Sequence, residues 1–413
     1  MNINKILTLV SIYFLVFFLG RGYALEISNV DGAVQKNQQV TIKGSGFGEK
    51  TTAAPVIWDD FENGVHGDGL PEHSDWIKKP GPSVSNGGYY WNITPYSGNL
   101  CAYNYSDASQ IDEFNTSYQQ YPDTDEVYVS YNLRVDFTGS PMPGYNYPDG
   151  NIKLTRVTSE NDEGGDYYGG TGYTGTHYAS KFDIWEHQYI SDADLNGGGG
   201  GSPKGTFRRG EWQRVEMYKK LSTPGGTDGI FWCAKNNGVA FNDEAATTRA
   251  AGYSFKQNAV ILGLMPVNLA PDDATCAIRI DNFYLDNTRA RVEIGNDQNF
   301  SQCTMREIQL PITWTDSQIQ IMINQGKFLD GENLYLFVVD QNGNVSPGHP
   351  ITIGDGETED TTSPTVSSQS PAPGSTGVSQ NTYVSFHVID VGDGVDIDSI
   401  RLYIDDVETA VDI

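Results

Sequence analysis

The stretch Glu-Trp-Gln-Arg-Val-Glu-Met-Tyr-Lys-Lys-Leu, residues 211–221, decides the fold class of this chain. Its side chains alternate in character, so a strand would place Val215 and Met217 on one face. The opposite face would carry Trp212, Arg214, Glu216, Tyr218 and Lys220. The same alternation recurs at 39–43, 126–135, 181–190 and 385–389, and no sustained helical periodicity follows residue 25. The sequence therefore predicts an all-β protein.

Composition limits the classes of partner. The chain has 413 residues, of which 38% are hydrophobic, so it can bury more than one core. Its 26 Lys and Arg residues are outnumbered by 53 Asp and Glu residues, which gives a net charge of −27. A charge of this sign repels phosphate backbones and anionic lipid. We therefore expect no nucleic-acid partner.

The first 24 residues have the pattern of a cleaved secretory signal. Lys5 precedes an apolar run at 6–19, and small residues at Gly22 and Ala24 predict cleavage after Ala24. The alternative is a membrane anchor, for which the apolar run is short. We expect an exported protein, secreted or held at the cell surface, with no transmembrane segment after cleavage.

Four cysteines, Cys101, Cys233, Cys276 and Cys303, are widely spaced and form no Cys-x-x-Cys pair. In an exported protein they could form one or two disulfides. Buried free thiols are the alternative, and the connectivity stays open.

Two distant segments share one resemblance. Residues 26–30 and 38–48, ending in Gly-Ser-Gly-Phe-Gly, resemble the opening strands of an IPT/TIG domain, an Ig-like family. The resemblance implies a turn whose glycines permit positive φ and whose Phe47 closes the core. Residues 291–295, 312–319 and 334–346 resemble the later strands of the IPT/TIG domain. The resemblance implies one domain, made of 25–55 and 291–354, that is split by an insertion. The alternative is an N-terminal strand pair packed on the inserted domain, with a separate small domain after it.

The inserted block, 56–290, is long enough to need its own core. It opens with Val-Ile-Trp-Asp-Asp-Phe-Glu at 56–62 and closes with Ile-Arg-Ile-Asp-Asn-Phe-Tyr-Leu-Asp at 278–286. These strands resemble the ends of concanavalin A-like jelly-roll domains, the lectin, glucanase and polysaccharide lyase fold. A polar linker is expected at 355–363. Residues 364–413 resemble an incomplete bacterial Ig-like domain.

Two strands in the inserted block carry the predicted binding residues. The strand at 181–190 places five side chains on one face: Lys181, Asp183, Trp185, His187 and Tyr189. The strand at 211–221 adds Trp212, Arg214, Glu216 and Tyr218. Aromatic planes receive sugar C–H faces, and charged groups bond hydroxyls. We therefore expect a glycan groove and a polysaccharide partner; the alternative is an ordinary solvated sheet face.

Catalysis stays open at this point. The Glu-x-Asp-x-x-Glu strand of concanavalin A-like glucanases does not occur in the chain. A polysaccharide lyase needs a cation for the uronate and a base. Arg214 could supply the first, and His187 or Tyr218 the second, although the longer lyase signatures are missing. A purely structural or adhesive surface protein is the third alternative.

A structural calcium ion is the one expected cofactor. In jelly-roll carbohydrate-binding modules, acidic residues of the first and last strands help to hold Ca²⁺. The matching positions here are Asp60, Glu62 and Asp281. Carboxylate oxygens are suitable ligands for calcium. Solvated acidic residues at strand ends are the alternative. The oligomeric state is not predicted.

Overall fold

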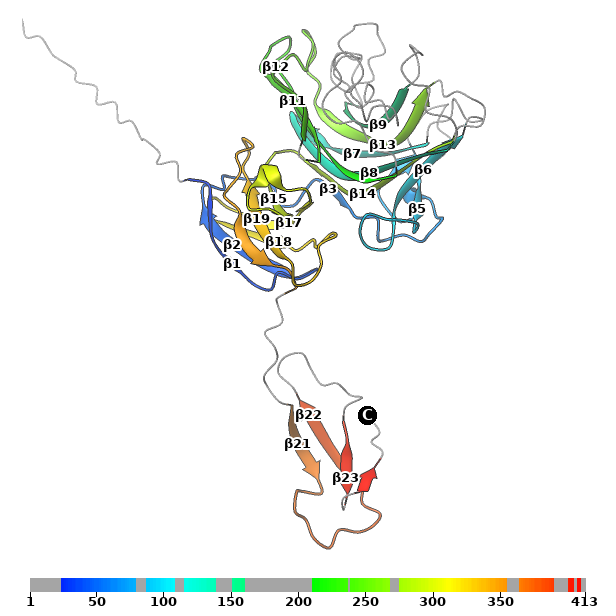
Figure 1. Cartoon of the computed structure of the whole chain (residues 1–413), viewed down its shortest axis with the longest axis vertical. Helices are drawn as coiled ribbons and strands as arrows, with labels where there is room; N and C mark the ends of the chain where they lie inside the picture. Colours follow the sequence, from blue (N-terminus) through cyan, green and yellow to red (C-terminus); the bar gives the residue numbers. More distant parts are fainter. Residues whose placement is uncertain are drawn as a thin grey trace, which may run out of the picture.

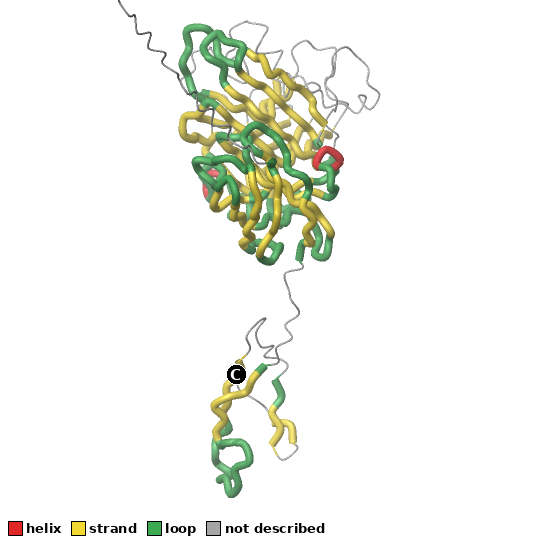
Figure 2. Tube along the Cα trace, turned by 90° about the vertical axis from the view of Figure 1, so that its left-hand side faces the viewer, coloured by secondary structure: helices red, strands yellow, loops and turns green. Residues whose placement is uncertain are grey.

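The computed structural model describes residues 24–78, 87–107, 115–138, 151–159, 210–236, 238–267, 275–354, 364–389, 400–404 and 407–409. Within these residues the chain is all-β, as predicted, and two short 3-10 helices, Leu70–Glu72 and Phe300–Gln302, interrupt the strands (Figure 2). No helix among them is long and apolar enough to cross a membrane.

The larger sandwich is built on an eight-stranded antiparallel sheet, in the order β12-β11-β10-β8-β14-β6-β5, with β3 also paired to β14 (Figure 1). We call it the main sheet. Its strands are β3 Ile57–Asp59, β5 Tyr89–Trp91, β6 Cys101–Asp107, β8 Glu126–Thr138, β10 Trp212–Lys220, β11 Gly229–Lys235, β12 Gly238–Ala246 and β14 Thr275–Asp286.

A four-stranded sheet covers one face of the main sheet. Its order is β4-β7-β13-β9, with bounds β4 Ile77–Lys78, β7 Asn115–Thr124, β13 Gln257–Val267 and β9 Asn151–Thr158. One buried cluster draws on both sheets, including Val129 and Leu133 from β8, and Val260 and Leu262 from β13. Val215 and Met217 belong to the same cluster, so the predicted inward face of β10 is confirmed. The other face of the main sheet is its outer face.

The smaller sandwich combines the two ends of the split segment. One sheet has the order β1-β2-β18-β17 and the other β16-β15-β19-β20. The bounds are β1 Glu26–Asp31, β2 Gln39–Ser45, β15 Arg291–Gly295, β16 Arg306–Ile308, β17 Leu310–Trp314, β18 Gln318–Met322, β19 Asn333–Val339 and β20 His349–Thr352. Strand β2 pairs with β18, and Val40 and Ile42 share a core with Val292 and Ile294. The segment 57–286 therefore leaves this sandwich after β2 and returns at β15.

The turn after β2 shows why glycine is needed there. Gly46 and Gly48 have φ of 72° and 74°, a region that favours glycine. A Cβ added at Gly44 would lie 2.0 Å from the carbonyl oxygen of Glu26 and 2.5 Å from the Phe47 ring. Phe47 is fully buried in the core of the smaller sandwich. The expected turn geometry and the core role of Phe47 are confirmed.

The C-terminal strands form two separate antiparallel pairs. β21 Thr365–Ser370 pairs with β22 Ser385–Ile389, and β23 Leu402–Ile404 pairs with β24 Val407–Thr409. Tyr383 is 93% exposed, so the described part of this segment does not enclose a core.

Three of the cysteines are buried free thiols in the structure. Cys101, Cys233 and Cys303 form no disulfide, which favours the free-thiol alternative for these three. Burial raises the pKa of the Cys101 and Cys303 thiols, so neither has the thiolate character of a reactive cysteine. The side chain of Cys276 is not among those described.

Candidate functional site

Half of the predicted groove lies outside the described residues. This half is the strand with Lys181, Asp183, Trp185, His187 and Tyr189. The other predicted residues, Trp212, Arg214, Glu216 and Tyr218, lie on β10 and point to the outer face of the main sheet. These four residues lie in two different environments.

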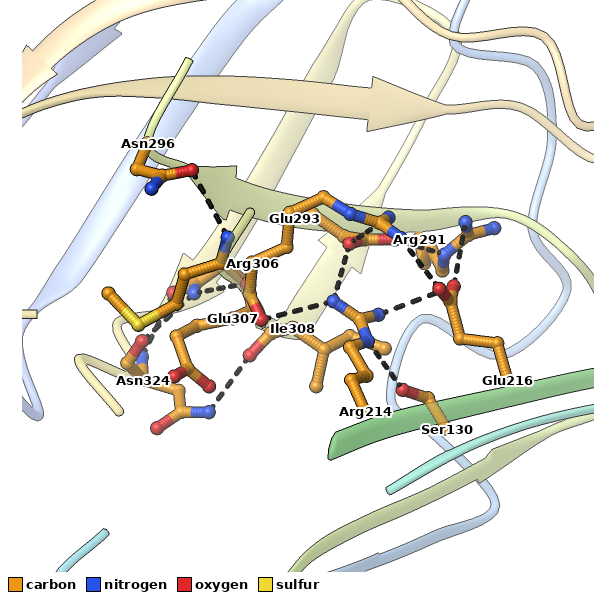
Figure 3. Close-up of polar contacts among 12 residues, drawn as sticks. Ser130, Arg214, Glu216, Arg291, Glu293, Asn296, Arg306, Glu307, Ile308 and Asn324 are labelled. Carbon is orange, nitrogen blue, oxygen red and sulfur yellow. Dashed lines mark hydrogen bonds and ion pairs between the residues drawn. The ribbon is translucent and has the colours of Figure 1, made fainter. Parts of the chain in front are cut away.

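The smaller sandwich covers Arg214 and Glu216 (Figure 3). Arg214 Nη1 lies 2.7 Å from Glu293 Oε2, and Arg306 Nη2 lies 2.6 Å from Glu216 Oε2. Arg306 Nη1 also lies 2.6 Å from Glu293 Oε2, and Arg291 Nε lies 2.6 Å from Glu293 Oε1. We call these five residues the junction network. Its members come from β10 of the larger sandwich and from β15 and β16 of the smaller one.

The junction network is buried and its charges are compensated. Burial alone would raise the pKa of Glu293, but Arg214, Arg306 and Arg291 together hold it below the ordinary value. The same balance lowers the pKa of Glu216. Ser130 Oγ accepts from Arg214 Nε at 3.0 Å, so the guanidinium is further satisfied. Both carboxylates therefore stay ionised between two domains.

The expectation of an open groove at Arg214, Glu216 and Tyr218 is wrong. Glu216 is 1% exposed and Tyr218 is 2% exposed. The Tyr218 hydroxyl donates to Glu126 Oε2 at 3.0 Å, and burial followed by Glu126 raises the pKa of that hydroxyl. A raised pKa opposes the role of base, and Arg214 is already paired with glutamate. The reason is packing: residues 291–308 cover this part of the sheet.

An apolar cluster and a second buried ion pair extend the covered region. Tyr128 and Tyr284 of the outer face pack with Ile308 of β16. Lys50 Nζ lies 2.6 Å from an Asp286 carboxylate oxygen, with both side chains 1% exposed. The covered half of the outer face therefore stabilises the contact between the sandwiches.

The other half of the outer face, which the smaller sandwich leaves uncovered, carries a straight row of side chains across five neighbouring strands; we call it the uncovered half. In the strand registers Trp212 pairs with Arg134, Arg134 with Arg279, Arg279 with Tyr103, and Tyr103 with Tyr89. Paired residues point to the same face of a sheet, and four strand spacings span about 19 Å. We call these five residues the transverse row. All five side chains are half-buried, so part of each meets solvent.

The centre of the transverse row is cationic. Asp136 binds both arginines: its Oδ2 lies 3.0 Å from Arg134 Nε, and it also pairs with Arg279 Nη1. Two arginines with one aspartate leave one positive charge in a chain of net charge −27. The Arg279 guanidinium lies 5.3 Å from the centroid of the Tyr103 ring, within cation–π distance.

An aromatic stack flanks the row on β5 and β6. Trp91 stacks on Tyr103 with a centroid distance of 4.5 Å and an interplanar angle of 16°, and Tyr105 lies 6.4 Å beyond. At the other end, Trp212 Nε1 donates to the Thr94 carbonyl at 3.1 Å. The row is thus aromatic at both ends and held by packing and hydrogen bonds.

Two of the carboxylates expected to bind calcium accept hydrogen bonds from the backbone of the loop at 96–100. Glu62 Oε1 accepts from the backbone N–H groups of Asn99 and Leu100, each at 2.8 Å. Asp281 Oδ2 accepts from the Tyr96 N–H at 2.9 Å, and burial raises the pKa of Asp281. Asp60 Oδ1 accepts from the Glu62 N–H at 3.3 Å. Calcium at Asp60, Glu62 and Asp281 stays a prediction.

A different set has converging ligand atoms. In the described part of the chain, Asp68, Glu72 and His73 offer metal-ligand atoms within 4.8 Å of one another. His73 Nε2 already lies 2.7 Å from Asp68 Oδ2. No sequence pattern predicts this cluster, because its residues stand next to no expected strand pair.

Comparisons with known proteins give weak structural likenesses. No family model and no curated protein matches the chain. A cellulose-induced protein, Cip1, is 15% identical over 56% of this chain and 97% of its own, with a TM-score of 0.32. The alginate lyase Aly36B with a bound alginate trisaccharide is 14% identical over 58% and 100%, with a TM-score of 0.34. A Trichoderma reesei endo-β-1,4-glucuronan lyase is 13% identical over 56% and 95%, with a TM-score of 0.32. Likenesses this weak assign neither family nor function.

Proposed function

We propose that this chain is an exported polysaccharide-binding protein whose binding surface is the transverse row. The observation that carries the proposal is the register of Trp212, Arg134, Arg279, Tyr103 and Tyr89 across five strands of one sheet. An elongated row of about 19 Å matches an extended polymer better than a small metabolite. The signal-like pattern at 1–24 supports export.

The chemistry of the row fits an acidic polysaccharide. The aromatic side chains at its two ends can pack on apolar sugar faces. The two central arginines offer planar donor groups, which bind carboxylate or sulfate groups in a bidentate manner. Asp136 compensates one positive charge and leaves one for the ligand. An acidic polymer can therefore be attracted locally despite the net negative charge, because screening confines repulsion to about 10 Å.

The alternative of a polysaccharide lyase, with Arg214 and Tyr218 in catalytic roles, is not favoured by the structure of β10. Both side chains are already used in buried contacts with glutamates. His187, the other expected base, lies outside the described residues. Binding without turnover is the function that the described side chains support.

Affinity electrophoresis tests the proposal. The protein is run in gels that contain an acidic polysaccharide (alginate, polygalacturonate or glucuronan) or a neutral one (cellulose derivative or xylan). We expect one acidic polysaccharide to retard it, and R279Q to abolish most of the retardation. The same gels with calcium and with chelator test whether the expected ion matters. Migration unchanged by every polysaccharide in both conditions would contradict the proposal and favour a structural or adhesive role.

A further inference from the structure

A cavity of about 530 Å³ lies where the chain crosses between the two sandwiches. Residues 49–51, which leave the smaller sandwich, and 287–289, which return to it, both line the cavity. The side chains that matter to its chemistry are Glu49, Lys50, Glu126, Tyr218, Lys220 and Arg289. No residue of the transverse row lines this cavity. A volume of this size between domains is typical of small-molecule sites.

Arg289 is the unusual residue of this cavity. Its guanidinium lies 4.7 Å from the Tyr218 ring centroid and 5.6 Å from that of Trp232. No carboxylate of the described residues lies within ion-pair distance of it, and its buried Nε makes no hydrogen bond with them. By contrast, Arg291 pairs with Glu293 at 2.6 Å. A buried donor without a partner costs free energy, which an acceptor on a ligand would recover.

The other charges around the cavity are mostly compensated within the protein. Glu126 accepts from the Tyr218 hydroxyl at 3.0 Å and lies 3.3 Å from Lys220 Nζ. Lys50 is paired with Asp286 at 2.6 Å. Glu49 is exposed. Among the described residues that line the cavity, Arg289 is therefore the cation without a carboxylate partner.

The hairpin at 340–344 lies against Arg289, and a glycine in it leaves room for the guanidinium. A Cβ added at Gly343 would lie 2.5 Å from Arg289 Cζ, so glycine is needed for the close approach. Asp340, the nearest acidic residue of this hairpin in sequence, accepts from the backbone N–H groups of Asn342 and Asn344, each at 2.8 Å. Its carboxylate is thus committed to the turn. The hairpin also brings the amide side chains of Gln341 and Asn342 to the cavity wall.

We propose that this cavity is a second binding site, which takes a small hydroxylated carboxylate of the uronic acid type. Arg289 binds the carboxylate through two parallel N–H donors, which is the strong geometry for this pair. The hydroxyls of Thr51 and Thr288 and the amides of Gln341 and Asn342 are suitable partners for the ligand hydroxyl groups. This second site is distinct from the polysaccharide surface because the two share no residue.

Titration calorimetry on the full chain tests the second site, with sodium glucuronate as the acidic probe and glucose as the neutral one. We expect saturable binding of glucuronate and none of glucose. R289Q should weaken glucuronate binding by at least about tenfold. N342W should block the cavity from its exposed hairpin while leaving Arg289 in place, so it checks the site even if R289Q fails to fold.

Matched controls separate this site from the transverse row. R134Q/R279Q should leave glucuronate binding unchanged, and R289Q should leave polysaccharide retardation unchanged. The proposal is overturned if glucose binds as well as glucuronate, or if folded R289Q and N342W both bind glucuronate like the wild type. It is also overturned if glucuronate binding is lost in R134Q/R279Q, since the probe would then occupy the row.

Discussion

The two halves of the outer face of the main sheet differ in what covers them, although β8, β10 and β14 contribute to both. On the covered half, Arg214 and Glu216 of β10 are buried in the junction network. On the uncovered half, Trp212 of the same strand begins the transverse row. Alternation in a strand thus assigns side chains to a face, whereas burial of that face depends on distant segments.

Ion pairs contribute differently to the free energy of unfolding in the two halves. The carboxylates of the junction network are at most 1% exposed, so removing either one would leave buried guanidinium groups without a partner. Arg134 and Asp136 are 24% and 29% exposed, and solvent screens their pairing. The covered half therefore stabilises the protein, and the uncovered half keeps its polar groups available for a ligand.

The largest predicted effect is on the junction network. E293A removes the carboxylate shared by three arginines and should lower the free energy of unfolding by about 3–5 kcal/mol. D136A removes the carboxylate shared by two arginines on the uncovered half and should lower it by about 1 kcal/mol or less. Urea denaturation of the two variants measures the contrast. Equal losses would show that the two halves do not differ in this way.

A pH-dependent effect on stability is expected at Glu307, the β16 residue next to Arg306 of the junction network. Burial raises the pKa of Glu307 to about 7 from an ordinary value of 4.5, and the residue accepts from the Tyr96 hydroxyl at 2.6 Å. A raised carboxyl pKa means that folding binds a proton, so this contribution to stability is complete below about pH 4.5 and is lost as pH rises through about 7.

E307Q removes this titration while keeping an oxygen acceptor for Tyr96. The variant should be more stable than the wild type by about 3 kcal/mol at pH 8, and the difference should shrink toward pH 4.5. Thermal unfolding at a series of pH values measures it. E26Q, at an exposed glutamate, is the control and should show no such trend. A stability difference independent of pH would contradict the assignment.

A smaller effect on polysaccharide retention is expected when a tryptophan of the transverse row is removed. W212A should weaken polysaccharide retention by about tenfold, because the ring ends the transverse row. W232A, on the covered side of the same sheet, is the matched control and should retain the polysaccharide like the wild type. Melting temperatures of both variants check that they fold. Similar losses in the two variants would remove the distinction between the halves.

The smallest predicted effect concerns calcium. If Ca²⁺ binds at Asp60, Glu62 and Asp281, millimolar calcium should raise the melting temperature of chelator-treated protein by a few degrees through mass action. E62Q should abolish the increase, whereas E72Q, in the other acidic cluster, should not. An identical melting temperature with calcium and with chelator would contradict a calcium site at these residues.

Local pattern was enough to predict much of the fold. Alternation predicted the all-β class, and the inward positions of Val215 and Met217 followed from it. The resemblance of the Gly-Ser-Gly-Phe-Gly stretch to the IPT/TIG turn predicted positive φ and a buried Phe47, and both are confirmed. These features depend on residues close in sequence, so their physical causes can be read without the tertiary structure.

The candidate site was predicted only in part, for a physical reason. Trp212 was identified, but Arg134, Arg279, Tyr103 and Tyr89 were not. Their row arises from the order and register of strands that lie far apart in the sequence, such as β5 and β14. The alternation at 126–135 was a usable signal for Arg134. Burial of Arg214 and Glu216 depends on β15 and β16, which strand periodicity in β10 cannot reveal.

The most direct test of the account compares two charge-matched variants in polysaccharide retention. R134Q/R279Q removes two cations from the transverse row, and K36Q/K43Q removes two exposed cations from the smaller sandwich. Both change the net charge by −2. We expect retention by the acidic polysaccharide to be lost in R134Q/R279Q and kept in K36Q/K43Q. Equal retention by the two variants would contradict the transverse row as the binding surface.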